Sequence, residues 1–302
     1  MNRDSLLLVG DNPFHQVSHL SQERATSRGE DLLRPECAAN LVMTSVCSGA
    51  NGFMFTASET TLQMLRIISK RKECEQLPLY AITPYAYDFV RIAAITGGML
   101  GLAKKLAKEI VYSWNYKAII NGVKGVLRVD PTALLKCYLI YEIYRLKKAA
   151  DNKLKMASVL LHEIVTDMAL ALNMDWIFKT HMDVMQDNGL KAGFETRNFF
   201  HFVKKFGEWG IKTDNLVIAA PFNKLGFQMN PSKEKCEEAL AQISEAEVIA
   251  FSVLAAGHLN LANAMDYIAA LPNVSGVAIG VSREQQAIET FNECKLYLQQ
   301  LT

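Results

Sequence analysis

Short apolar runs alternate with amphipathic stretches along most of the chain. The runs are three to six residues long and are bounded by turn-forming or polar residues, as expected for parallel strands that are buried on both faces. Eight runs predict strands: Leu6 to Val9, Gly52 to Ala57, Leu79 to Thr83, Ala157 to Leu161, Ala192 to Phe194, Leu216 to Ala219, Val248 to Ser252 and Val277 to Ile279.

The stretches between these runs have the apolar spacing of helices that pack one face against a sheet. They predict helices over Asp31 to Cys47, Thr60 to Lys72, Lys204 to Trp209, Lys233 to Ile243, Leu261 to Ala270 and Arg283 to Leu298. The pattern predicts an α/β fold, a TIM (β/α)8 barrel that occupies residues 1–302 as a single domain, with its site at the carboxyl ends of the strands. An open doubly wound sheet is the alternative, but Gly10-Asp-Asn-Pro13 is not the Gly-rich turn of a dinucleotide-binding sheet.

A long interruption follows the third predicted strand. Residues 86–152 are too many for one barrel helix and predict a helical insertion, with breaks at Gly97-Gly98 and Gly101 and a helix start at Asp130-Pro131. The stretch Lys104 to Val111 is basic and amphipathic, which indicates either a solvated helix face or contact with a membrane surface or acidic partner. The insertion is expected to form a lid over the barrel or the surface of a homo-oligomer.

Composition narrows the class of protein. Of the 302 residues, 50% are hydrophobic and 21% charged, and the formal net charge is +1, which is typical of a soluble globular domain. Without a strong positive charge, nucleic-acid binding is not expected. The six cysteines are scattered without a Cys-x-x-Cys pair, so neither a structural metal nor a disulfide framework is expected. The first apolar run is too short for a signal peptide, and we expect a cytoplasmic protein with no membrane span.

Four segments, taken in their order along the chain, carry a family resemblance. They are Gly49 to Ala57 (GANGFMFTA), Gln186 to Gly193, Phe251 to Gly257 and Gly280 to Ser282. The first three are similar to the second strand, the turn before the fifth strand and the seventh strand of the aldo/keto reductase superfamily. The fourth resembles the region where those enzymes hold the adenosine end of a nicotinamide cofactor. The resemblance implies the same barrel and covers most of it, but not the insertion.

The resemblance also implies a catalytic tetrad of Asp, Tyr, Lys and His for carbonyl reduction. Only the histidine is found, as His162 after the fourth strand. The aspartate position falls on Phe55, the stretch Ser58 to Thr61 supplies no tyrosine, and the lysine position falls on Pro84. A tyrosine within 85–87 is the nearest replacement for the acid, but no lysine adjoins it. The chemistry of this barrel is therefore predicted to be altered or lost.

Polar residues gather where the first, fourth and fifth strands end. They are Asp11, Asn12 and His15, then His162 and Glu163, then Glu195, Arg197 and Asn198. Because these ends share one edge of a barrel, Asp11, His162 and Glu195 are the candidate catalytic residues and the others are candidate substrate contacts. The three would act as acid and base or would hold a divalent metal. The structural alternatives are that Asp11 caps a turn and that Arg197 forms a salt bridge with a glutamate.

The last three strand ends offer ligand-binding candidates. They are Asn223 and Lys224 after the sixth strand, Gly257 and His258 after the seventh, and Gly280, Ser282 and Arg283 after the eighth. A desolvated Lys224 would form a Schiff base with a carbonyl substrate. The alternatives for Lys224 are a hydrated side chain and contact with a phosphate of the substrate. The residues of the last two ends lie where barrels commonly bind a phosphate, and we assign Gly257, Gly280, Ser282 and Arg283 to a cofactor. For Ser282 the alternative is a helix N-cap.

Three hypotheses of function follow. The first is a divergent barrel enzyme that uses acid–base or metal-assisted chemistry on a small molecule, with or without a phosphate. The second is an NAD(P)-dependent oxidoreductase with a rearranged acid. The third is a non-catalytic binding barrel that acts through the insertion. The sequence leaves open the substrate, the reaction type and the choice between a divalent metal, a nicotinamide cofactor and neither.

Overall fold

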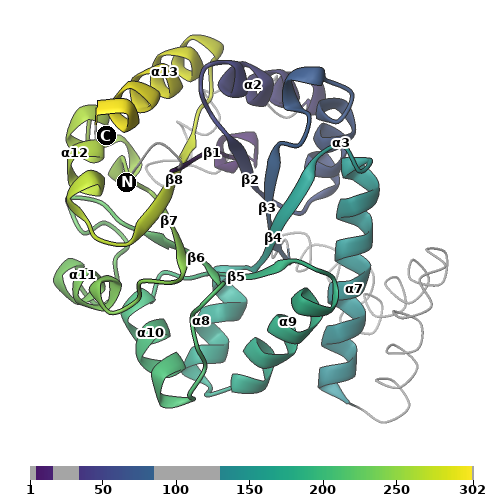
Figure 1. Ribbon diagram of the computed structural model, residues 1–302, viewed down its shortest axis with the longest axis vertical. Coiled ribbons are helices and arrows are strands. Elements are labelled where there is room, and N and C mark those ends of the chain that lie inside the picture. Colours follow the sequence, from purple (N-terminus) through teal and green to yellow (C-terminus); the bar gives the residue numbers. More distant parts are fainter. Residues whose placement is uncertain (1–4, 16–33, 85–129, 301–302) are drawn as a thin grey trace.

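The molecule is built on a closed barrel of eight parallel strands that follow one another around the ring in chain order (Figure 1). This computed structural model describes residues 5–15, 34–84 and 130–300. The strands are β1 (Leu6–Gly10), β2 (Gly52–Thr56), β3 (Pro78–Thr83), β4 (Lys155–Leu161), β5 (Lys191–Glu195), β6 (Val217–Pro221), β7 (Glu247–Phe251) and β8 (Val274–Gly280). The barrel closes where β1 pairs with β8, from Leu6 opposite Gly276 to Gly10 opposite Gly280. All eight predicted strands and the predicted fold class are confirmed.

Helices surround this barrel on its outer side (Figure 1). They are α2 (Pro35–Cys47), α3 (Glu59–Ile68), α7 (Pro131–Ala150), α8 (Glu163–Ala171), α9 (Asp175–Asp187), α10 (Phe199–Glu208), α11 (Lys233–Ala241), α12 (Leu261–Ala270) and α13 (Glu284–Gln300). Short 3-10 helices are η1 (Asn12–His15), η3 (Lys72–Cys74) and η4 (Ala255–Gly257). The predicted helix at Lys204 to Trp209 was too short, because the buried face of α10 begins at Phe199 and continues through Phe202 and Phe206.

The strands place alternate side chains in two separate apolar layers, as the two-residue period of a strand requires. The barrel interior is filled by Leu8, Met54, Tyr80, Ile82, Leu160, Val217, Ala219, Ile249 and Ala278. The layer between barrel and helices is larger and includes Leu7, Val9, Phe53, Phe55, Phe194, Ile218 and Val248. The interior is therefore a packed core, and ligands must bind at an end of the barrel or outside it.

The described part of the predicted insertion is α7, a long helix that runs along the side of the barrel (Figure 1). It packs against α3 and α9, and thus forms part of the helical layer. Asp130 caps it as predicted, because its Oδ1 accepts hydrogen bonds from the N–H groups of Thr132 (2.9 Å) and Ala133 (3.3 Å). Residues 85–129, with the basic stretch and the glycine breaks, lie outside the described residues. The insertion and a homo-oligomer through residues 86–152 remain predictions.

None of the helices within the described ranges 5–15, 34–84 and 130–300 is both long enough and apolar enough to cross a membrane.

Candidate active site at the carboxyl ends of the strands

Two carboxylic side chains meet where β4 and β5 end. Glu163 is the first residue of α8, two residues after β4 ends at Leu161, and Glu195 is the last residue of β5. The backbone N–H of Glu163 donates a hydrogen bond of 3.2 Å to Glu195 Oε2. This bond ties the start of α8 to the end of the neighbouring strand and fixes the Glu195 carboxyl group at the barrel mouth.

Glu195 is the most strongly perturbed acid of this cluster. Burial is the main cause that raises its pKa to about 8, and the negative charges of Glu163 and Asp11 raise it further. The hydrogen bond from the Glu163 N–H and the charge of Arg197 act in the opposite direction. At neutral pH the side chain is therefore mostly a protonated carboxylic acid, which is able to donate a proton.

His162 caps α8 and is held in one tautomer. Its Nδ1 accepts a hydrogen bond of 3.2 Å from the N–H of Ile164, so the neutral ring carries its proton on Nε2. Burial is the main cause that lowers the pKa of His162, and Arg197 lowers it further, whereas Glu163 and Asp11 oppose the shift. The imidazole is therefore neutral at pH 7 and presents an Nε2–H donor, while its Nδ1 serves the helix.

Asp11 follows β1 and is only 4% exposed. Its Oδ2 accepts a hydrogen bond of 2.6 Å from the N–H of Thr56, which joins the ends of β1 and β2. The Asp11 charge acts on both His162 and Glu195, so the three predicted catalytic residues lie within electrostatic range of one another. Within the described ranges, however, no three His, Cys, Asp or Glu side chains are placed to hold a metal ion. The predicted metal-ligand arrangement of these three residues is therefore not formed.

Arg197 and Glu163 form an ion pair beside Glu195, with Arg197 Nε 2.5 Å from Glu163 Oε2. The side chains are 29% and 18% exposed respectively. The sequence allowed either substrate contact by Arg197 or a salt bridge with a glutamate, and the salt bridge is confirmed. Because Glu163 raises the Glu195 pKa and Arg197 lowers it, the pair also determines how strongly Glu195 holds its proton.

Asp167 belongs to this cluster, although its position in the sequence did not single it out. Its carboxylate accepts hydrogen bonds from Thr196 Oγ1 (2.5 Å), Asn198 Nδ2 (2.9 Å) and the N–H of Arg197 (3.3 Å). Burial is the main cause that raises the pKa of Asp167, and these hydrogen bonds oppose the shift. One signal was present in the sequence, because Asp167 lies one helical turn after Glu163 and therefore on the same side of α8. The predicted substrate contact Asn198 thus uses its amide group within the protein.

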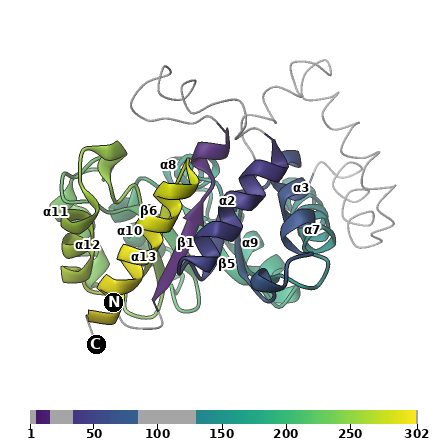
Figure 2. The ribbon, with the colours of Figure 1, turned by 90° about the horizontal axis from the view of Figure 1, so that it is seen from above.

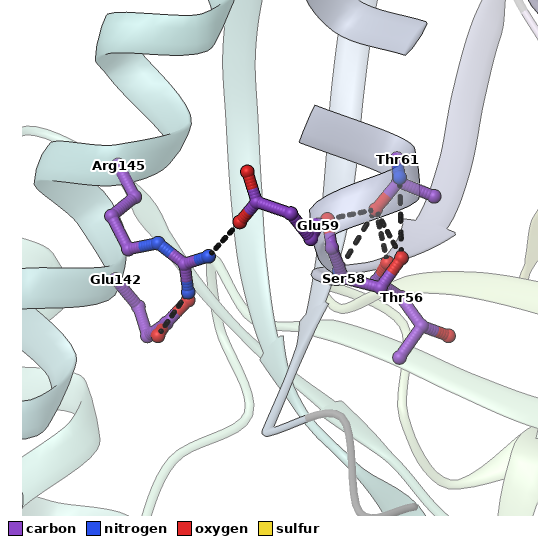
Figure 3. Close-up of polar contacts among 6 residues, drawn as sticks. All are labelled: Thr56, Ser58, Glu59, Thr61, Glu142 and Arg145. Carbon is purple, nitrogen blue, oxygen red and sulfur yellow. Dashed lines mark hydrogen bonds and ion pairs between the residues drawn. The ribbon is translucent and has the colours of Figure 1, made fainter. Parts of the chain in front are cut away.

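The stretch where the resemblance would place a catalytic tyrosine, Ser58 to Thr61, forms the start of α3 (Figure 3). Ser58 and Thr61 make a capping box in which each side chain bonds to the other's backbone N–H, at 2.8 and 3.2 Å. Thr61 Oγ1 also donates to the carbonyl oxygen of Thr56 at 2.7 Å. Glu59 pairs with Arg145 of α7 at 2.9 Å, and Arg145 also pairs with Glu142 at 3.0 Å. These side chains have structural partners and hold α3 against α7.

Phe55, which the resemblance aligned with a catalytic aspartate, does not face the barrel interior. It lies in the layer beneath the helices, with its ring stacked on Phe53 at a centroid distance of 4.8 Å. Met54 faces the interior, and the alternation of a strand gives Thr56 the same side. Phe55 therefore belongs to the layer that faces the helices, and the inward-facing Met54 and Thr56 carry no group that ionises at neutral pH. The absence of the catalytic aspartate remains a prediction.

Pro84 follows the end of β3, as predicted, and is preceded by Thr83. Thr83 Oγ1 and Tyr138 Oη, from α7, are 2.6 Å apart and share a hydrogen bond. Burial is the main cause that raises the pKa of Tyr138 well above its ordinary value, so this phenol does not ionise near neutral pH. Tyr85 and Tyr87 lie outside the described residues.

The remaining predicted contacts have different surroundings. Asn12 is exposed and begins η1, and His15 is the last residue of that 3-10 helix. Asn223 is fully buried and closes its own loop, because its side chain bonds to both the N–H and the carbonyl oxygen of Phe227 at 2.8 Å. Lys224 is exposed, so the desolvation that a Schiff-base lysine needs is absent. His258 is also exposed.

The residues predicted to bind a cofactor are only partly available for contact with a ligand. Gly257, Gly280 and Arg283 are exposed, but Gly280 lies against Pro13 of η1, where an added Cβ would be 2.9 Å from Pro13 Cδ. Ser282 donates from its N–H (3.0 Å) and its hydroxyl (3.2 Å) to Gln286 Oε1, so both of its donors are engaged. Ser282 also precedes the α13 cap position and is therefore not the predicted N-cap.

A groove within the described residues lies outside the barrel. It is a groove of about 640 Å³ over α2, beside the start of α13, and its lining includes Thr44, Arg71, Ser282 and Arg283. Figure 2 shows α2 and α13 side by side on the outer face of the barrel, where they are in contact. None of the acid–base cluster lines this groove, so the two features are separate.

Comparison with known proteins supports the fold. A structure described as an aldo-keto reductase from Pseudomonas aeruginosa has a TM-score of 0.57 and 13% identity, over 97% of this chain and 90% of that chain. The chain shares its barrel fold with this structure. The aldo-keto reductase of Bacillus halodurans in its holo form gives a TM-score of 0.53 at 13% identity, over 98% and 91% of the two chains. A second aldo-keto reductase structure from Pseudomonas aeruginosa gives 0.56 at 13% identity, over 97% and 90%.

No protein-family model matches the chain, and no curated protein sequence matches it. At 13% identity, the similarity to these structures concerns the aldo-keto reductase fold alone.

Proposed function

We propose that this barrel is an enzyme that performs acid–base chemistry on a small carbonyl compound at the carboxyl ends of its strands. One observation carries the proposal. A carboxylic acid with a pKa of about 8, Glu195, lies in the same cluster as a neutral histidine whose proton is on Nε2, His162. Such a pair supplies both a proton and a hydrogen bond to an oxygen atom that gains negative charge.

In the proposed reaction the three residues have different roles. His162 Nε2–H donates a hydrogen bond to the substrate carbonyl oxygen and orients it. The Asp11 carboxylate takes a proton from the carbon next to the carbonyl, and the electron pair of that C–H bond moves to form a carbon–carbon double bond. Glu195 donates its proton to the carbonyl oxygen, which becomes the hydroxyl of an enol. Reversal of these transfers at the same or the neighbouring carbon completes exchange or isomerisation.

Solvent-deuterium incorporation tests this proposal on many candidate substrates with one readout. The purified protein is incubated in D2O with a panel of small aldehydes and ketones, and loss of the C–H signal is followed by proton NMR. We expect at least one compound to exchange, and Glu195→Gln to slow that exchange by roughly 100-fold, the lower end of a general acid's contribution. Glu245→Gln, an exposed glutamate in the turn before β7, is the matched control and should leave the rate unchanged. Equal rates in the two variants, or no exchange with any compound, would contradict the proposal.

A further inference from the structure

Three consecutive residues after Glu195 are held by one carboxylate of the adjacent helix. Asp167 lies in the middle of α8 and accepts from the Thr196 hydroxyl at 2.5 Å, the Arg197 N–H at 3.3 Å and the Asn198 amide at 2.9 Å. Thr196 Oγ1 in turn accepts from the N–H of Asn198 at 2.9 Å. The turn that leaves β5 is therefore fixed through its side chains and its backbone together, and Thr196 is fully buried within it.

This arrangement determines where the Arg197 guanidinium lies. With its backbone held by Asp167, Arg197 reaches Glu163 through Nε at 2.5 Å. Glu163 and Asp167 both come from α8, so the helix holds Arg197 at two points, one on the backbone and one on the side chain. The same helix provides the N–H that bonds to Glu195. Asp167 thus connects α8 to β5 on the side of Glu195 that carries the ion pair.

Resting on the proposed function, we infer that Asp167 is a positioning residue of this site, which holds the Thr196–Asn198 turn so that Arg197 stays against Glu163 beside the Glu195 carboxyl group. Charged acceptors make the stronger hydrogen bonds, and three donors on one carboxylate account for the full fixation of the turn. Asp167 makes no proton transfer in this scheme. Its effect passes through Arg197 and Glu163, whose charges shift the Glu195 pKa in opposite directions.

Asp167→Asn tests the inference because it keeps the shape of the side chain but loses the charge and one acceptor. We expect the rate constant of deuterium exchange at saturating substrate to fall about tenfold or more with little change in KM. The Glu195 pKa should rise above its wild-type value, because Arg197 no longer remains in place to favour the ionised form. Asp183→Asn, an exposed aspartate of α9, is the matched control and should change neither quantity.

Thr196→Val removes the hydroxyl that donates to Asp167 and leaves every charge in place. It should shift the Glu195 pKa in the same direction as Asp167→Asn, and its effect should disappear when Asp167 is already Asn. A purely structural role predicts a lower midpoint of unfolding with an unchanged Glu195 pKa and exchange rate, and that result would overturn the inference.

The Glu195 pKa is measured by NMR on the full chain without substrate, so it distinguishes this inference from failure of the proposed reaction. If Glu195→Gln leaves exchange intact while Asp167→Asn still shifts the Glu195 pKa, only the reaction is wrong.

Discussion

Glu163 donates its backbone N–H to the Oε2 of Glu195, and its side chain binds Arg197 on the same side of the barrel mouth. One residue therefore affects the Glu195 carboxyl group in two opposing ways. The N–H favours the ionised form of Glu195, whereas the negative charge of the Glu163 side chain favours the protonated form. Burial changes the pKa of Glu195 more than either of these contacts does, so the acid is expected to stay protonated at neutral pH.

The raised pKa of Glu195 predicts a specific dependence of stability on pH. A group whose pKa is higher in the folded than in the unfolded state stabilises the fold fully below the unfolded pKa, and this contribution is lost as pH rises through the folded value. Wild-type stability should therefore fall between about pH 4.5 and about pH 8. Glu195→Gln mimics the protonated acid, so it should be the more stable protein at pH 8.5, by on the order of a few kcal/mol, and equal at pH 4.5. Chemical denaturation at pH 4.5 and at pH 8.5 measures the free energy of unfolding of both proteins, with Glu245→Gln as control. A variant that is less stable at pH 8.5 would contradict it.

The pKa shifts of Glu195 and His162 predict how the rate of catalysis depends on pH. The rate should fall as pH rises through about 8, because Glu195 then loses the proton that it must donate. His162 should cause no change in rate between pH 6.5 and 8, because burial lowers the pKa of His162 beneath its ordinary value and the ring stays neutral in that range. Measurement of kcat/KM for exchange from pH 4.5 to 9.5 checks both expectations. A rate that continues to rise above pH 9 would rule out Glu195 as the proton donor.

Arg145 should contribute strongly to stability, because its Glu142 partner is only 6% exposed (Figure 3). Loss of one member of a buried ion pair is strongly destabilising, so Arg145→Gln should lower the free energy of unfolding by roughly 3 kcal/mol. Lys179→Gln provides the comparison, since Lys179 pairs with Asp175 on the surface and should cost less than about 1 kcal/mol. Equal losses in the two variants would show that the Arg145 pair does not hold α7 in place.

Gly280 should tolerate no side chain, because it adjoins the loop that carries Asp11. An added Cβ would lie 2.9 Å from Pro13 Cδ and 3.0 Å from Pro13 Cγ. Gly280→Ala should therefore destabilise the fold by roughly 1–3 kcal/mol and reduce exchange, since Pro13 must move. Gly207→Ala in α10 meets open space and should stabilise the helix by about 0.5–1 kcal/mol. Thermal unfolding of both variants compares the two glycines, and a neutral Gly280→Ala would contradict the packing argument.

The sequence was sufficient for the barrel and for the region of the site. Strands buried on both faces leave a clear apolar signal, and the topology of the barrel then places His162 and Glu195 at one edge. Side-chain direction along a strand was less predictable, because neighbouring residues face opposite sides of the barrel wall, and only the structure shows that Phe55 faces the helices. Asn223 looked like a ligand contact but serves its own loop, and such local bonding leaves no periodic signal. Asp167 was missed because it lies within α8, whereas the groups that it binds follow β5, and the sequence does not show that the two segments meet.

The pKa of Glu195 tests its role as the proton donor most directly. Protein labelled with carbon-13 at the glutamate side-chain carboxyl carbon is titrated by NMR from pH 3 to 10, and the signal absent from Glu195→Gln identifies the residue. Burial of the Glu195 carboxyl group predicts a midpoint at about 8, far above that of the exposed glutamates. A midpoint between 4 and 5 would mean that Glu195 is ionised at neutral pH, and it would contradict the role of Glu195 as the proton donor.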